Sequence, residues 1–175
     1  ADARHYPSID WVTSFSGHVH TAGEWWHKEV DPDWEKRRAT ALALLARDAE
    51  LSRIVNLVGP EALSDAQRWE LEGAGLVKEG VLQQSALDDV DTFCSPQKQY
   101  ALLDLAITIY KRGAALIDIG VPVSELQTLP ILAKMRRLKS MYTSEQMDQI
   151  EDFRVEVNAS LEAIRVEYAK QGEQP

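Results

Sequence analysis

Apolar residues recur every three or four positions along most of this chain, which is the spacing of one face of an α-helix. No window of useful length alternates apolar and polar residues as a half-buried strand would. The pattern therefore predicts an all-α fold, a helical bundle of about five or six helices. The last predicted helix shows the spacing most clearly, at Met147, Ile150, Val157, Leu161, Ile164 and Tyr168.

Capping residues mark where these helices begin and end. Asp31 followed by Pro32 is a typical start, and Gly59 followed by Pro60 is a typical stop. Between them the apolar stripe changes register, so we expect a bend or a break near Asp48. Further starts are predicted at Ser64, at Ser95 with Pro96, at Ser124, and at Thr143 with Gln146.

Two features bear on how these helices pack. The stretch after Ser95 is apolar on nearly all faces and is expected to be the central helix of the core. Pro130 should kink or split the helix that contains it, because proline removes a backbone donor. Gly73, Gly75 and Gly80 lie inside an earlier predicted helix, which indicates close approach to another backbone or a frayed second half.

These patterns divide the chain into three parts. Residues 1–30 lack helical spacing and are expected to form an irregular lead-in that is rich in aromatic side chains. Residues 31–171 are expected to form the helical bundle. Gly172 should end the last helix, so that residues 172–175 form a frayed tail.

Charge and composition narrow the classes of partner. The net charge of −9 argues against nucleic acid, because binding phosphates requires clustered lysine and arginine. No run approaches the roughly 20 apolar residues needed to cross a bilayer, so direct membrane insertion is not expected. The dense basic patch more often forms a solvated helix face than a binding site, and comprises Lys134, Arg136, Arg137 and Lys139.

A group of three histidines, a group of three aspartates and a single cysteine are candidates for metal binding or catalysis. The histidines lack a further ligand at a recognised metal-site spacing, and the acids lack the glycine and glutamate of a calcium loop. We therefore expect no metal site and no complete catalytic site in these residues. The single cysteine permits no internal disulfide and fits core packing better than a nucleophile. The residues concerned are His18, His20 and His27, then Asp88, Asp89 and Asp91, and finally Cys94.

Three segments in order carry a family resemblance: "HYPSIDWVTSFS", "AELSRIVNLVGPEALSDAQ" and "VLQQSALDDVDTFCSPQKQ". Together they resemble the C-terminal domain of the catalytic A subunit of V-type and A-type rotary ATPases. The resemblance implies a missing upstream domain that holds the P-loop and binds ATP or ADP with magnesium. It also implies that this fragment alone binds no cofactor and hydrolyses no ATP.

The resemblance further implies partners and a location. The partners would be the B-type subunit of the same ATPase and a coiled-coil rotor subunit of the central stalk. The domain would then be cytoplasmic and peripheral to the membrane, held there through the assembled complex. Composition and periodicity leave an alternative open, a stand-alone helical adaptor with no nucleotide role, because both functions require the same bundle.

Two positions match the adenine pocket of that family. Tyr6 corresponds to the aromatic residue that stacks on adenine, although it could instead pack on the core of this domain. Leu87 lies where the family usually carries phenylalanine within Asn-Ala-Phe-Asp, and the segment here is Ser-Ala-Leu-Asp. A leucine can cover a base by apolar contact but offers no π-face for stacking.

The third match is the loop from Gly59 to Gln67. It lies where the related F-type β subunit has its acidic DELSEED turn, at the end of the bundle that pushes on the shaft. The resemblance implies a rigid helix-loop-helix that contacts the rotor. The expected rotor-contact residues are Gly59, Pro60, Glu61, Ser64 and Asp65.

Overall fold

The computed structural model describes Trp11 and residues 18–84 and 88–172. These residues contain helices and no strands, which confirms the all-α prediction. A 3₁₀ turn at Pro60–Ala62 and a π-helical turn at Lys78–Leu82 complete the helical segments. The α-helices are α1 (Val19–Glu29), α2 (Trp34–Val58), α3 (Asp65–Val77), α4 (Pro96–Asp118), α5 (Val123–Gln127), α6 (Pro130–Met141) and α7 (Met147–Gly172).

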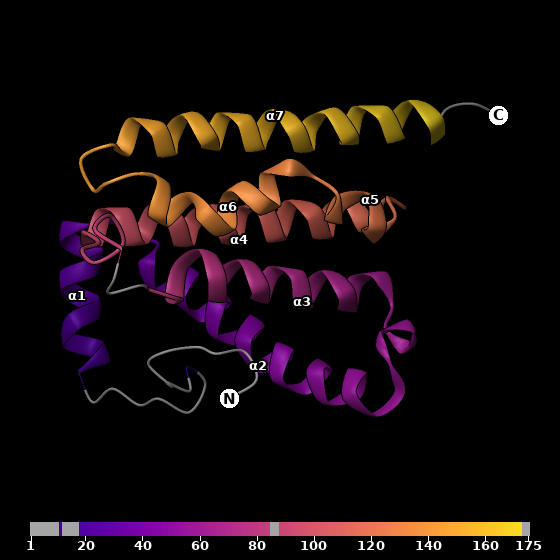
Figure 1. Cartoon of the computed structure of the whole chain (residues 1–175), viewed down its shortest axis with the longest axis horizontal. Coiled ribbons are helices and arrows are strands. Elements are labelled where there is room, and N and C mark those ends of the chain that lie inside the picture. The colour runs from indigo at the N-terminus through magenta and orange to yellow at the C-terminus, as the bar shows by residue number, and fades with distance from the viewer. Residues whose placement is uncertain (1–10, 12–17, 85–87, 173–175) are drawn as a thin grey trace.

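The long helices run roughly side by side and define two ends of the bundle (Figure 1). Helices α2 and α3 form a hairpin whose turn lies at one end, next to the C-terminus of α4 and to α5. Helix α1 and the loop before α4 lie at the opposite end. Helix α7 covers α4 and α6 along its length, so that α4 is the central helix.

Helix α4 is central because its side chains are apolar on several faces. Leu102, Leu105 and Ile107 are fully buried in the core. On the side toward α3, the indole Nε1 of Trp69 donates a hydrogen bond of 2.8 Å to the backbone oxygen of Tyr110. A Cβ added at Gly113 would lie 2.1 Å from the Trp69 ring, so glycine is required for this close approach of the two helices.

The capping predictions largely agree with the structure. Ser64 forms a capping box with Gln67, and the Ser95 side chain accepts a hydrogen bond from Lys98 N. Gly59 ends α2 with a φ of 88°, a conformation that favours glycine. Pro130 splits its helix into α5 and α6.

Several helix starts differ from the predicted ones. Helix α2 begins at Trp34 rather than at Pro32, and the Asp31 side chain accepts a hydrogen bond of 2.8 Å from Asp33 N. Helix α5 begins after Pro122 rather than at Ser124. Shifts of one or two residues are common at helix ends, because the terminal turns fray.

Two larger predictions about the first half of the chain are wrong. The irregular lead-in predicted for residues 1–30 does not hold for Val19–Glu29, which forms α1. Helix α1 packs on α2 through the ring of Trp26, which stacks on Trp34 with centroids 5.2 Å apart. This tertiary contact stabilises α1, which does not need an extended apolar stripe of its own. The sequence of α1 therefore shows little helical periodicity.

The break predicted near Asp48 is also absent, since α2 continues from Trp34 to Val58. The Asp48 carboxylate lies 2.9 Å from Nζ of Lys78, at the start of the π-helical turn that follows α3. The polar residue that interrupts the stripe is thus accommodated by an ion pair across the hairpin, and the helix continues through it.

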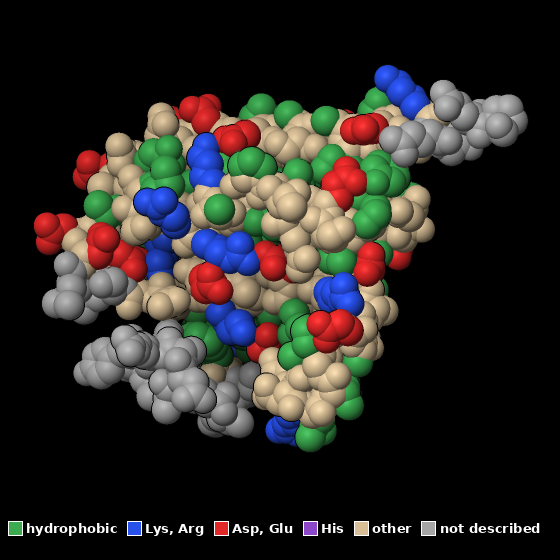
Figure 2. Space-filling view, turned by 45° about the vertical axis from the view of Figure 1, so that its right-hand side comes forward, with side chains coloured by type: hydrophobic (Ala, Val, Ile, Leu, Met, Phe, Trp, Pro, Cys, Tyr) green, Lys and Arg blue, Asp and Glu red, His purple; other side chains and the backbone are tan. Residues whose placement is uncertain are grey.

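The basic patch is tied into the bundle. Arg136 forms ion pairs with Glu72 and Glu79, and Lys134 pairs with Glu156 on α7. Figure 2 shows the mixture of acidic and basic side chains on one face of the molecule. Most of the patch therefore links helices by partly exposed ion pairs and does not form a free cationic surface.

Candidate functional site

The turn between α2 and α3 is built from the residues expected to contact the rotor. Gly59 N donates to Val55 O at 2.9 Å, and Pro60–Ala62 forms the 3₁₀ turn. Ser64 then caps α3. We call residues 57–65, which contain this turn and the last two residues of α2, the tip loop.

The tip loop is attached to a second part of the bundle. The carboxylate oxygen Oδ2 of Asp65 accepts a hydrogen bond of 3.0 Å from the backbone nitrogen of Val123, at the start of α5. Within the loop, the side chain of Leu63 is buried. Asp65 therefore has a structural role, and the sequence analysis did not anticipate it because its partner lies 58 residues away.

The outer surface of the tip loop is apolar with one acid. Leu57 is 83% exposed and Val58 is 65% exposed, and Pro60, Glu61 and Ala62 are also exposed. In Figure 1 this turn projects at the end of the bundle where α2 meets α3. Exposed leucine and valine side by side are more typical of a contact surface than of a solvated turn.

The opposite end of the bundle contains the loop before α4. The Asp88 carboxylate accepts hydrogen bonds from Val90 N at 2.9 Å and from Asp91 N at 3.0 Å. Asp91 is only 4% exposed and lies 3.3 Å from Nζ of Lys139, which is 5% exposed. These acids shape the loop and anchor it to α6, and Asp91 is buried rather than solvated.

The two adenine-pocket candidates, Tyr6 and Leu87, lie outside the described residues. Their described neighbours in sequence are Trp11 and Asp88. Their proposed roles therefore stay predictions. Nearby, Cys94 is half-buried, and burial is the main cause that raises the pKa of its thiol. A raised pKa disfavours the nucleophilic thiolate.

The histidines do not form a metal site in the part of the chain that the structure describes. No group of three or more His, Cys, Asp or Glu side chains there is arranged to hold a metal ion. His18 and His27 are exposed, and Nδ1 of His27 lies 3.2 Å from the backbone oxygen of Pro32. The side chain of His20 is not among those described.

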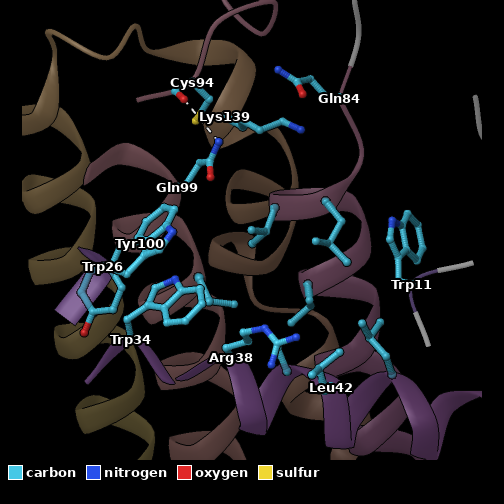
Figure 3. Close-up of a pocket in the computed structure, with 16 residues that line it drawn as sticks. Trp11, Trp26, Trp34, Arg38, Leu42, Gln84, Cys94, Gln99, Tyr100 and Lys139 are labelled. Atoms are coloured by element: carbon cyan, nitrogen blue, oxygen red, sulfur yellow. Dashed lines mark hydrogen bonds between the residues drawn. The ribbon is translucent and has the colours of Figure 1, made fainter. Parts of the chain in front are cut away.

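A cavity that the sequence did not reveal lies between α1, α2, α3 and α4 (Figure 3). Its volume is about 530 Å³, within the range typical of small-molecule sites. Aromatic rings of Trp11, Trp26, Trp34 and Tyr100 line it, together with Arg38 and apolar side chains of α2 and α3. The available sequence signal was the aromatic character of the predicted lead-in, which contains Trp11 and Trp26.

Comparison with known proteins identifies the family to which this helical domain belongs. A family model described as the C-terminal domain of V and A type ATP synthase matches residues 23–126. The chain belongs to this family. The match includes the α2–α3 hairpin, the tip loop, the whole of α4 and two of the three segments, and it confirms the family resemblance.

Individual relatives agree with the family assignment. The V-type ATP synthase alpha chain of Nitrosococcus oceani is 53% identical over 172 residues, which are 98% of this chain and 29% of that protein. The A subunit of the A-type ATP synthase of Desulfurococcus sp. is 44% identical over 139 residues, 79% of this chain and 24% of that protein. Its counterpart in Methanopyrus kandleri is 37% identical over 164 residues, 94% of this chain and 28% of that protein.

The chain spans less than a third of the length of each of these relatives. Within the described residues, none of the helices is both long and apolar enough to cross a membrane.

Proposed function

We propose that this domain is the lever in the catalytic subunit of a rotary ATPase, carrying movement between a nucleotide site and the central stalk. In that role it acts within an enzyme that couples ATP hydrolysis or synthesis to ion transport. The full subunit binds ATP or ADP with magnesium and works beside a B-type subunit. It stays peripheral to the membrane, on the cytoplasmic side, through the assembled complex.

The observation that carries this proposal is the fixed tip of the α2–α3 hairpin. Helix α2 is 25 residues long without interruption, and the hydrogen bond from Val123 N to Asp65 ties the tip loop to α5. A lever has to move as one body, and closely packed helices with short connections deform little under load. The attachment of the tip loop to two separate parts of the bundle meets that requirement.

The five residues expected at the rotor contact divide into two groups. Gly59, Ser64 and Asp65 shape and anchor the turn, so their contribution to rotor contact is to hold the loop in place. Pro60 and Glu61 are exposed and would touch a coiled-coil rotor directly. The exposed side chains of Leu57 and Val58 extend that surface.

The nucleotide end of the lever would include Tyr6 and Leu87 as two walls of an adenine pocket. Support comes from the loop that follows Leu87, which the Asp88 hydrogen bonds and the Asp91–Lys139 ion pair hold against α6. A wall residue must be held by its surroundings to contribute to binding. The phosphates and magnesium would be bound by the upstream domain.

The rotor contact is tested by cross-linking in the assembled complex of the longer subunit. In a Cys94→Ser background, Ala62→Cys places a thiol on the exposed tip loop for attachment of a photoreactive maleimide. Illumination is expected to join the tip loop to the stalk and to stop ATP hydrolysis. The matched control, Ala159→Cys, lies on the exposed surface of α7. Equal capture of the stalk from both positions would contradict the proposal.

The adenine pocket is tested separately in the same complex. Tyr6→Ala should raise the KM for ATP by about tenfold, because base–aromatic stacking is worth about 1–3 kcal/mol. Leu87→Phe should lower the KM by adding a stacking surface. An unchanged KM in both variants would remove these residues from the nucleotide site and leave the rotor contact unaffected.

A further inference from the structure

We propose that the cavity between α1 and the bundle binds a planar, apolar organic monoanion. The site combines an apolar enclosure with one cation that has no acidic partner among the described residues.

The shape and lining of the cavity favour a flat apolar molecule. Trp26 and Trp34 stack with an interplanar angle of 13°, and Trp34 and Tyr100 present their rings to the cavity (Figure 3). Aromatic rings beside aliphatic side chains suit a ring system that makes stacking and dispersion contacts. The apolar wall is completed by Leu42, Leu45, Val77, Val81 and Leu103.

The charges of the cavity favour an anion. Its described lining residues include Arg38 and Lys139 and no carboxylate, although the chain as a whole carries a net charge of −9. Lys139 is already paired with Asp91 at 3.3 Å. Of the described lining residues, Arg38 is therefore the cation available for a ligand.

Arg38 is positioned to meet a ligand. Its guanidinium carbon lies 6.0 Å from the centroid of the Trp34 ring, and no ion pair to it forms within the described part of the chain. Figure 3 shows its side chain among the residues that line the cavity. A half-buried guanidinium beside an aromatic ring can pair with a carboxylate or sulfonate while the ring system of the ligand lies on the indole.

One available cation also defines the charge of the ligand. A nucleoside triphosphate needs several positive groups around its phosphates, and the cations among the described lining residues are Arg38 and the paired Lys139. A single carboxylate or sulfonate matches the site. Because α1 forms one wall and α2 to α4 form the others, such a ligand would hold α1 against the bundle.

Anilinonaphthalene sulfonate, an aromatic monoanion, is a suitable probe, with phenylnaphthylamine as its neutral counterpart. Fluorescence titration of the 175-residue chain is expected to show saturable binding of one sulfonate probe per chain. Arg38→Gln should weaken the sulfonate by about tenfold and leave the neutral probe within about twofold, because only the charged hydrogen bond is lost. Arg53→Gln, at an exposed position of α2 outside the cavity, should change neither.

A second variant separates this cavity from the general surface. Val81→Phe fills the cavity from its wall and should weaken both probes without unfolding the chain, as circular dichroism can verify. ATP in excess should not displace the sulfonate. The proposal is overturned if binding is not saturable, if Arg38→Gln matches the native chain, if Val81→Phe has no effect, or if ATP displaces the probe.

Discussion

The Arg154 guanidinium on α7 donates a hydrogen bond of 2.5 Å to the carboxylate of Asp104 on α4. Asp104 is only 8% exposed, and its other oxygen lies 2.6 Å from Nε of Arg37 on α2. One buried carboxylate therefore links three helices. Its two arginine partners together compensate the loss of hydration that burial imposes on a charged group.

Replacing Asp104 should be among the most destabilising single changes in the bundle. Asp104→Ala leaves two half-buried guanidinium groups without their shared acid, and should lower the free energy of unfolding by about 3 kcal/mol. Urea denaturation followed by circular dichroism measures this. Glu151→Ala is the matched control, because Glu151 is an exposed partner of Arg154 within one helix, and its loss should have little effect.

Two glycines in the α3–α4 region should respond to alanine in opposite ways. At Gly113 a Cβ would lie 2.1 Å from the Trp69 ring, so Gly113→Ala should destabilise the domain by about 2 kcal/mol through overpacking. At Gly75 the nearest atoms would be 3.8 Å away, at the end of the Arg136 side chain. Gly75→Ala should therefore be neutral or stabilising by up to about 1 kcal/mol.

Thermal unfolding of Gly113→Ala and Gly75→Ala, each compared with the native domain, tests these two expectations. A Gly113→Ala domain as stable as the native one would show that α3 and α4 can separate freely, and would contradict the packing described for Trp69.

The raised pKa of the Tyr100 phenol predicts that the domain loses stability at alkaline pH. Burial, followed by the hydrogen bond to Asp31, raises the pKa of this phenol from 10.0 to about 12. The folded state holds this proton more tightly than the unfolded chain, so the stabilising contribution is complete below pH 10 and disappears as the pH rises toward 12.

The test compares the native chain with Tyr100→Phe across that pH interval. The difference in free energy of unfolding between the two should shrink as the pH rises, because only the native chain has this phenol to ionise. Tyr110 and Tyr168 also have a raised pKa, and the comparison cancels their contribution. A difference that stays constant would argue against a raised pKa of Tyr100 in the folded chain.

The two acids of the tip loop should behave differently. Asp65→Ala removes the acceptor of Val123 N and should cost about 1 kcal/mol of stability, with the helix content preserved. Glu61→Ala, at an exposed position, should leave stability within about 0.5 kcal/mol of the native value. Circular dichroism melting curves measure both. Equal effects would show that the hydrogen bond to Val123 contributes nothing.

Local sequence signals predicted the parts of the fold that local chemistry controls. Ser64 and Ser95 were found because a cap bonds to a backbone group only three residues away. Gly59 and Pro130 were found because each acts on its own backbone. The central position of α4 followed from its apolar composition.

Long-range contacts account for what the sequence analysis missed. Asp48, within the continuous α2, is paired with Lys78, which lies 30 residues away. Helix α1 depends on the stacking of Trp26 on Trp34, and the cavity exists only once α1 and the bundle are packed together.

The candidate site also has a part that the sequence predicted and a part that only the structure shows. For the tip loop, the family resemblance drew attention to Gly59–Gln67, and only the structure shows that Asp65 is an anchor, because its partner Val123 is remote in sequence. Tyr6 and Leu87 stay predictions.

The bond between Asp65 and Val123 also has a consequence for the order of folding. It joins residues 58 apart in the chain, and closing so long a segment is entropically costly unless α3 and α4 have already packed. The tip loop should therefore reach its final conformation late, after the hairpin and the central helix. Removing the Asp65 acceptor should accelerate unfolding while the folding rate stays almost unchanged.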